Sequence, residues 1–196
     1  MKYLAKIMTN QVEDIRKKLY SEEEKFFLDT NIWIYLYYGQ YPYDNKYFRR
    51  FYTNAFEKMC ANKCKIYLDA FVLTEFTRVF SHLEFNRIVP HVNRKEPNRN
   101  YYKIFRESDN GRQTAKEIVI QTNRILKKAQ LCDLNYNFIN IPDQLIEYRE
   151  TSSDFNDLTY IKLCKKHGFT LVTHDGDFRN CDIPVLTANN KLLGSH

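Results

Sequence analysis

Short apolar segments alternate with longer segments of helical periodicity along much of the chain. Four of the apolar segments have the length and composition of buried strands: FFLD at residues 26–29, KIYLD at 65–69, FTLVT at 169–173 and IPVLT at 183–187. Apolar residues recur every three or four positions over 31–39, 46–59, 70–89 and 154–168, which predicts helices. Strands separated by helices predict an α/β fold, with a central parallel sheet between two helical layers.

The segments outside this pattern form an extension and an enlarged middle of one domain, residues 1–196. Within the extension, residues 1–25, a helix is expected over 4–20, because apolar residues share a helical spacing there: Leu4, Met8, Val12, Ile15 and Leu19. That helix would pack on the domain or on a second copy of the chain, so a homodimer is one expected assembly.

The enlarged middle spans residues 82–149. Residues 90–102 hold two prolines and no period, which predicts a loop, and residues 113–128 predict a helix. Four apolar side chains of that helix are available for burial: Ile118, Ile120, Ile125 and Leu126. Residues 130–142 fit neither a helical nor a strand pattern.

Composition narrows the class of protein. No segment approaches the roughly 18–20 continuous apolar residues of a membrane span, and the N-terminus lacks the apolar region of a secretory signal, so a cytoplasmic protein without membrane contact is expected. The five cysteines are scattered and include no C-x-x-C pair, which argues against a disulfide framework or a structural zinc site. The net charge of +6 favours a polyanionic partner.

Acidic residues lie at the ends of the predicted elements, where a parallel sheet gathers its functional groups. Six of them come from four places: Asp29 at the end of the first strand, Glu75 in the helix after the second, Asp154 and Asp157 at the start of the helix before the third, and Asp175 and Asp177 after the third. Clustered like charges are unfavourable unless cations neutralise them, so this set predicts a divalent metal site. Oxygen ligands without a matching His or Cys set favour Mg²⁺ or Mn²⁺ over zinc.

Each acid also has a purely structural explanation. Asp29, Asp69 and Asp154 stand where a helix N-cap would, and Asp is common at that position. Asp177 fits a turn, and Glu75 could be an ordinary surface acid. The joint placement of the acids, rather than any one of them, supports a metal site.

Three blocks resemble the signature blocks of the PIN-domain nucleases, whose bacterial branch includes the toxins of toxin–antitoxin pairs. They are FFLDTNIWI, VLTEFTRVF and NDLTYIKLCKKHGFTLVTHDGDF, in that order. The third is the most specific, because it joins an Asp at a helix start, a Gly eleven residues later, a short apolar strand, Thr-x-Asp and Asp-Phe. A phosphatase with an aspartyl nucleophile would place a second Asp two residues after Asp29, where this chain has Asn31.

The resemblance covers about residues 26–80 and 150–187 and implies roles residue by residue. The matching acidic quartet is Asp29, Glu75, Asp157 and Asp175, and the implied metal ligands are Asp29, Asp157, Asp175 and Asp177. Thr30, Asn31 and Thr173 fall in the matching blocks as supporting residues, which would orient a carboxylate or a metal-bound water, and Asp154, at the start of the helix that carries Asp157, is a further supporting candidate. The extension and the enlarged middle depart from the family pattern, which leaves the substrate and regulation open.

A basic segment suggests how a nucleic acid would be held. Residues 82–106 carry six Lys or Arg against two acids, interleaved with aromatic side chains, and basic groups with aromatic faces are what a single-strand channel combines. The expected RNA-binding residues are Arg87, Arg94, Lys95, Arg99, Tyr101, Tyr102 and Arg106. A solvated loop beside an aromatic core would show the same pattern.

The sequence therefore predicts a Mg²⁺- or Mn²⁺-dependent endoribonuclease that cuts single-stranded or structured RNA. The resemblance implies products with 3′-hydroxyl and 5′-phosphate ends, and it implies an antitoxin partner if the chain is the toxin of such a pair. Two alternatives stay open at this point: a non-catalytic RNA-binding or scaffold protein that keeps the fold, and a flap-type DNA nuclease.

Overall fold

The computed structural model describes residues 12–40, 46–90, 93–96, 99–132, 139–151 and 154–194. Its centre is one six-stranded sheet with the strand order β1-β6-β5-β2-β3-β4, and every pairing is parallel. The strands are β1 (Val12–Asp14), β2 (Lys25–Leu28), β3 (Lys65–Leu68), β4 (Gln130–Leu131), β5 (Thr170–Val172) and β6 (Val185–Thr187). The predicted parallel α/β sheet is thereby confirmed.

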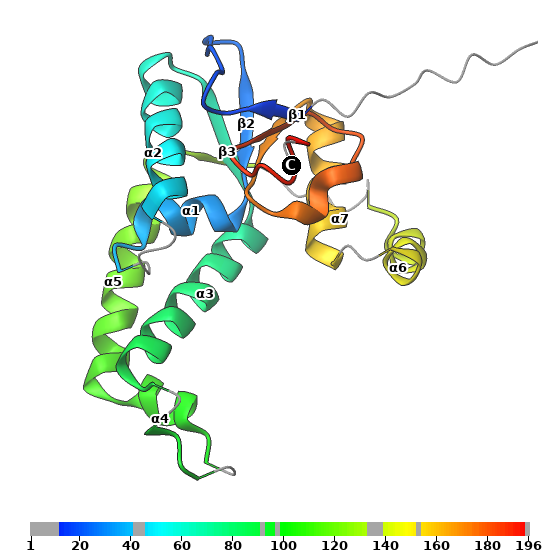
Figure 1. The fold of residues 1–196 in the computed structure, drawn as a ribbon. Helices are drawn as coiled ribbons and strands as arrows, with labels where there is room; N and C mark the ends of the chain where they lie inside the picture. The colour runs from blue at the N-terminus through cyan, green and yellow to red at the C-terminus, as the bar shows by residue number, and fades with distance from the viewer. Residues whose placement is uncertain are drawn as a thin grey trace, which may run out of the picture.

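Helices cover both faces of this sheet (Figure 1). Helices α1, α2, α3 and α5 lie together on one side, and α7 with α6 lies on the other. Their bounds are α1 (Thr30–Tyr37), α2 (Lys46–Ala61), α3 (Ala70–Ile88), α4 (Tyr101–Glu107), α5 (Asp109–Leu126), α6 (Ile141–Glu150) and α7 (Phe155–His167). The three-layer arrangement predicted from the sequence is confirmed, and no helix among the described residues is long and apolar enough to cross a membrane.

The central strands owe their burial to unbroken apolar sequence, as parallel strands covered on both faces require. Phe26, Phe27 and Leu28 of β2 are buried, and β2 pairs with both β3 and β5. Trp33 and Tyr52 bring large buried side chains from α1 and α2 onto the same core. This core fixes the carboxyl ends of β2, β3 and β5 at one edge of the sheet.

The N-terminal helix expected over residues 4–20 is contradicted where the structure describes the chain. Residues 1–11 lie outside the described part, and Val12–Asp14 form β1, which pairs in parallel with β6. The backbone N–H of Ile15 extends this pairing by donating to the carbonyl of Thr187 at 2.9 Å, and Ile15 is buried while Leu19 is 89% exposed. The helical spacing was misleading because a short edge strand needs only its backbone to pair.

The enlarged middle forms helices that project from the sheet. Helix α3 runs from the sheet edge to α4 at its far end, and α5 returns beside it (Figure 1). Of the apolar residues expected to be buried on α5, Ile125 is buried, whereas Ile120 and Leu126 are 47% and 40% exposed. Helix α6 begins at the end of the stretch 130–142, which fitted neither a helical nor a strand pattern, and residues 133–138 are outside the described part.

Candidate active site

Five carboxylates from four elements line one small pocket at the carboxyl edge of the sheet. The pocket has a volume of about 170 Å³ and is lined by Asp29, Glu75, Asp157 and Asp175, together with Asp154, Thr30, Asn31, Asn156, Ile34 and Val79. Asp29 follows β2, Glu75 lies in the second turn of α3, Asp157 is in the first turn of α7 and Asp175 follows β5. The structure thus brings together the four acids that the sequence motifs matched.

Asp29 is held by side chains rather than used as a helix cap. It stands at the N-cap of α1, but its carboxylate accepts no capping hydrogen bond from the helix. The Thr173 hydroxyl donates to Asp29 Oδ2 at 2.7 Å, and Asn31 Nδ2 donates to the same oxygen. The residue is only 7% exposed, so these contacts leave the carboxylate aimed at the pocket with its orientation fixed.

Thr173 and Asn31 also connect Asp29 to the loop that follows β5. The backbone N–H of Asp175 donates to Thr173 Oγ1 at 3.0 Å, and the backbone N–H of His174 donates to Asn31 Oδ1 at 3.1 Å. Asp175 then accepts a hydrogen bond from the backbone N–H of Asp177 at 3.0 Å, which starts the short 3₁₀ helix Gly176–Asn180. The side chains of Asp29, Asn31 and Thr173 therefore set the position of this loop relative to α1.

Glu75 is positioned by the first residue of α1. The Thr30 hydroxyl donates to Glu75 Oε2 at 3.0 Å, which ties α1 to α3 beside the pocket. The other carboxylate oxygen, Oε1, lies 3.6 Å from the guanidinium of Arg78, an exposed side chain one turn further along α3. One oxygen of Glu75 is thus fixed by a neutral donor, and the other faces a solvated cation.

The acids at the start of α7 divide between capping and lining the pocket. Asp154 is the N-cap, and its carboxylate accepts from the backbone N–H of Asp157 at 2.9 Å. The structural explanation for Asp154 is therefore correct, although the residue also borders the pocket. Asp69 is likewise a cap, which accepts from the backbone N–H of Val72 at 2.7 Å and does not line this pocket.

Burial and like charges raise the proton affinity of two of the acids. Burial, together with the charge of Glu75, raises the pKa of Asp29 to about 7 against the opposing hydrogen bond from Thr173. Burial also raises the pKa of Asp157 to about 8, with added repulsion from Asp154 and Asp29. These two carboxylates therefore favour a proton, or an equivalent positive charge, in the pocket.

The pocket suits a hard divalent cation in its donor chemistry. Its polar groups are carboxylate, hydroxyl and amide oxygens, which are the ligands that Mg²⁺ and Mn²⁺ prefer. A divalent cation would also supply the positive charge that the raised pKa values of Asp29 and Asp157 call for. Among the described residues, no three His, Cys, Asp or Glu side chains converge closely enough to hold an ion as they stand, so ion binding requires side-chain adjustment.

Other residues expected from the sequence lie elsewhere. Asp177 is exposed and does not line the acidic pocket, and none of the seven expected RNA-binding residues lines it. Six of those seven lie on or beside α4, at the end of α3 that is remote from the sheet (Figure 1). Arg87, on the last turn of α3, lines a different and larger pocket.

The sequence patterns missed three residues of the acidic pocket. Asn156 lies between the two acids of α7, and its place in the NDLTY block was the available signal. Ile34 and Val79 supply an apolar wall, one turn after Thr30 and Glu75 respectively. Helical spacing alone would have placed Ile34 beside Thr30 and Val79 beside Glu75.

Comparisons with known proteins agree with this geometry. A family model described as PIN domain matches residues 26–184. The crystal structure of VapBC2 from Rickettsia felis bound to a DNA fragment from their promoter resembles the chain with a TM-score of 0.51 at 18% sequence identity, covering 83% of this chain and 98% of that chain. At this identity the likeness concerns the fold. No curated protein matches the chain by sequence.

Proposed function

The chain belongs to the PIN domain family of nucleases, and from that premise we propose that it is a metal-dependent endoribonuclease. The observation that carries the proposal is the meeting of Asp29, Glu75, Asp157 and Asp175 in one pocket. These are the acids that the family motifs match, and they come from four separate elements. Two of them have a raised pKa, as expected of functional carboxylates gathered at one site.

The proposed ligands of Mg²⁺ or Mn²⁺ are Asp29, Asp157, Asp175 and Asp177. When bound, the cation would neutralise charge that develops on the phosphodiester and favour deprotonation of the attacking water. Asp29 enters with its orientation fixed by Thr173 and Asn31, which lowers the cost of arranging it for the reaction. Because Asp177 is exposed, its role as a ligand would require its side chain to turn towards the pocket.

Glu75 is the proposed general base. Its Oε2 is held by the Thr30 hydroxyl, so that the carboxylate keeps a fixed position beside Asp29. A base must lie within hydrogen-bond reach of the proton that it accepts, and Glu75 lines the same pocket as Asp29, Asp157 and Asp175, three of the four proposed ligands. Ile34 and Val79 would limit the access of bulk water on that side.

RNA is the proposed substrate, the cytoplasm the proposed location, and a partner antitoxin the proposed regulator. The net charge of +6 supports a polyanionic substrate, and the family resemblance supports RNA over DNA. The structural neighbour is named as a VapBC2 complex, which supports an association with a second protein. A homodimer stays a separate proposal.

The deciding experiment combines metal binding with cleavage. Calorimetry would follow Mn²⁺ binding to the wild type and to Asp29→Asn, and the same two proteins would be incubated with single-stranded RNA and with branched DNA. We expect Mn²⁺ binding and RNA cleavage in the wild type, and loss of both in Asp29→Asn while circular dichroism stays unchanged. Metal binding without cleavage of any substrate would favour a scaffold, and preferential cutting of branched DNA would favour a flap-type nuclease.

A further inference from the structure

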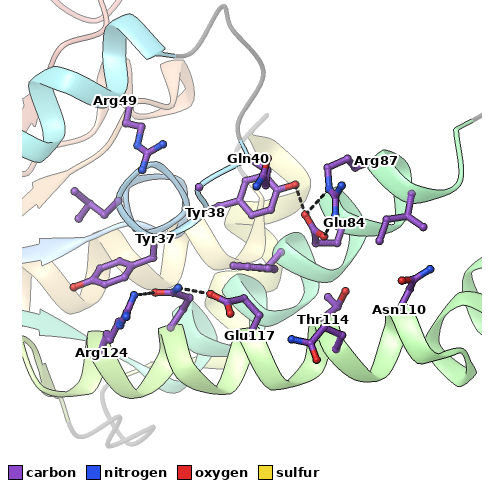
Figure 2. Close-up of a pocket in the computed structure, with 16 residues that line it drawn as sticks. Tyr37, Tyr38, Gln40, Arg49, Glu84, Arg87, Asn110, Thr114, Glu117 and Arg124 are labelled. Atoms are coloured by element: carbon purple, nitrogen blue, oxygen red, sulfur yellow. Dashed lines mark hydrogen bonds and ion pairs between the residues drawn. The ribbon is translucent and has the colours of Figure 1, made fainter.

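A second, larger pocket lies between α1, α3 and α5, and the proposed chemistry makes no use of it. Its volume is about 540 Å³, within the range of small-ligand sites, and α2 contributes Arg49 to its wall. Figure 2 shows side chains from all four helices directed into this space. Tyr37 and Arg124 lie at one end of the pocket, and Glu84 and Arg87 lie at the other end.

The larger pocket continues the acidic pocket along the same two helices. The acidic pocket is bordered by Ile34 of α1 and by Glu75 and Val79 of α3, whereas the larger pocket begins at Leu36 of α1 and Phe80 of α3. From Thr30, which lines the acidic pocket, to Tyr37, which lines the larger one, α1 advances by about 10 Å at roughly 1.5 Å per residue. A stacked single strand advances about 3.4 Å per nucleotide, so that distance corresponds to about three nucleotides.

Two arginines of the larger pocket have no carboxylate partner among the described residues. The ion pairs there engage neither Arg49 nor Arg124, and Arg124 instead donates to the side-chain oxygen of Gln121 at 3.3 Å. Arg87, in contrast, is neutralised by Glu84, with contacts of 3.0 Å and 2.7 Å. The positive charge available to a ligand is therefore carried by Arg124, beside Tyr37, and by Arg49, on the other side of α1 (Figure 2).

Amide, hydroxyl and carboxylate groups line the rest of the pocket. Gln121 donates from Nε2 to Glu117 while it accepts from Arg124, which gives a chain of polar groups along α5. Further lining groups on the same helix are Asn110, Gln113 and Thr114. The ring of Tyr37 is partly exposed at the Arg124 end. Together these offer hydrogen-bond donors, acceptors and an aromatic face, which are the groups that recognise an unstacked RNA base.

We propose that this pocket binds one nucleotide of the RNA substrate, about three positions from the scissile phosphate. One phosphate of the strand would contact Arg124 and a neighbouring phosphate Arg49, the base would lie against Tyr37, and Gln121 and Glu117 would face its edge. The pocket would thereby give the nuclease a preference for sequence at a distance from the cut. This inference rests on the proposed function for the identity of the substrate.

The polar lining favours a nucleotide over an acidic peptide. An acidic peptide would gain from Arg49 and Arg124, but the Glu117 carboxylate would repel it. A base presents N–H donors that this carboxylate accepts, so the same group is favourable for a nucleotide. Arg49 and Arg124 can bind phosphate, and the Glu117 carboxylate can accept from a base, so this set of side chains fits a nucleotide.

The test measures RNA binding without cleavage. Fluorescence anisotropy would follow a labelled single-stranded RNA decamer in EDTA with the wild type, with Arg49→Gln/Arg124→Gln and with the control Arg50→Gln/Arg112→Gln. The control pair lies on the same two helices and removes the same charge, but neither of its arginines lines the pocket. We expect about tenfold weaker binding in the pocket variant and a salt dependence shallower by about 1.4 in logarithmic slope for two lost phosphate contacts. Equal losses in the two variants would overturn the proposal.

Base recognition is tested by the ranking of AMP, GMP, CMP and UMP in titrations followed by NMR. We expect Glu117→Gln, which replaces an acceptor oxygen by a donor nitrogen, to change the ranking while thermal stability stays the same. An unchanged ranking would overturn the assignment of Glu117 to the base edge. Neither measurement depends on catalysis, so a wild type that binds RNA in EDTA but cuts none with Mn²⁺ would refute the proposed function alone.

Discussion

Thr173 and Asp29 are 144 positions apart in sequence, and the Thr173 hydroxyl donates to Asp29 Oδ2 at 2.7 Å. The contact follows from the parallel pairing of β2 with β5, in which Leu28 lies opposite Val172, so that the next residue of each strand meets at the sheet edge. Thr173 is fully buried and also accepts from the backbone N–H of Asp175. One hydroxyl thus sets the relative positions of two acids of the pocket.

Thr173→Val is expected to weaken metal binding and cleavage without unfolding the protein. Valine has nearly the shape of threonine but neither donates to Asp29 nor accepts from Asp175. Because the hydrogen bond from Thr173 lowers the pKa of Asp29, its loss raises that pKa further and makes the carboxylate a poorer ligand at pH 7. We expect a loss of about 10–100-fold in Mn²⁺ affinity or in kcat/KM, measured by calorimetry and RNA cleavage.

The matched control for this variant is Thr77→Val on α3. The Thr77 hydroxyl donates to the carbonyl of Thr74, within the helix and outside the pocket. Cleavage by this control is expected to stay within about twofold of the wild type. If Thr173→Val retained wild-type metal affinity as well, the hydrogen bond to Asp29 would have no role in preparing the site.

The metal-free protein is expected to lose stability as the pH rises from about 4 to about 8. The folded protein holds protons on Asp29, with a pKa of about 7, and on Asp157, with a pKa of about 8, whereas the unfolded chain releases them near 4. The folded state binds more protons in this window, so the free energy of unfolding falls with rising pH. Urea denaturation in EDTA at pH 5 and pH 8 measures the effect.

The comparison that isolates these two groups uses Asp29→Asn/Asp157→Asn, which removes both titrations. The loss of stability between pH 5 and pH 8 is expected to be larger in the wild type than in this variant by at least about 1.4 kcal/mol, the value of one pKa unit. Mn²⁺ should reverse the loss in the wild type only, because it binds the deprotonated carboxylates. Equal losses in both proteins would place the protons on other groups.

The sequence was sufficient to predict the central strands and the meeting of Asp29, Glu75, Asp157 and Asp175 at one edge of the sheet, because both follow from local features and strand order. A continuous apolar run such as FFL at 26–28 is typical of a strand that is buried on both faces of a parallel sheet. An acid that directly follows such a strand lies at the carboxyl edge of the sheet because of the strand direction. Gly168 marked the end of α7 correctly, since it adopts a left-handed conformation with φ of 66°. These features need no knowledge of distant contacts.

Features that depend on distant partners were missed. Val12–Asp14 became a strand because β6 offers it an edge, and that edge is formed more than 170 residues later. The large pocket was not predicted, because its lining comes from four helices whose packing no local pattern encodes. The predicted RNA-binding segment on α4 stays a prediction, and its residues lie away from the acidic pocket.

Gly168→Ala is expected to destabilise the protein and leave its chemistry unchanged. A Cβ at this position meets no atom within 4 Å, so the cost arises only from the positive φ that an alanine must adopt. That cost is about 1 kcal/mol, and it should appear as a lower midpoint in urea denaturation. Gly39→Ala is the control, since that position has room for a Cβ and no positive φ. A similar loss in both variants would point to a cause other than the left-handed backbone.

Lys95→Glu is expected to weaken RNA binding if the basic segment contacts the substrate. Lys95 is the cleanest probe of that segment, because it is exposed, whereas Arg94 lies 4.1 Å from the ring centroid of Phe85 and Arg99 pairs with Glu96 at 2.8 Å. Reversing its charge should therefore change the interaction with phosphate without disturbing local packing. We expect about a threefold to tenfold loss of affinity at low salt, measured by anisotropy in EDTA.

The control for that reversal is Lys127→Glu, an exposed residue at the end of α5. If α4 and the pocket near Arg124 contact different parts of one strand, Lys95→Glu and Arg49→Gln/Arg124→Gln should have additive effects on the binding free energy, because the sites share no side-chain partner. A decamer that spans both sites would show this additivity, whereas a tetramer should respond to the pocket variant alone. Loss of affinity for the tetramer in Lys95→Glu would mean that the charge acts through the general field of the protein rather than through a contact of the segment beside α4.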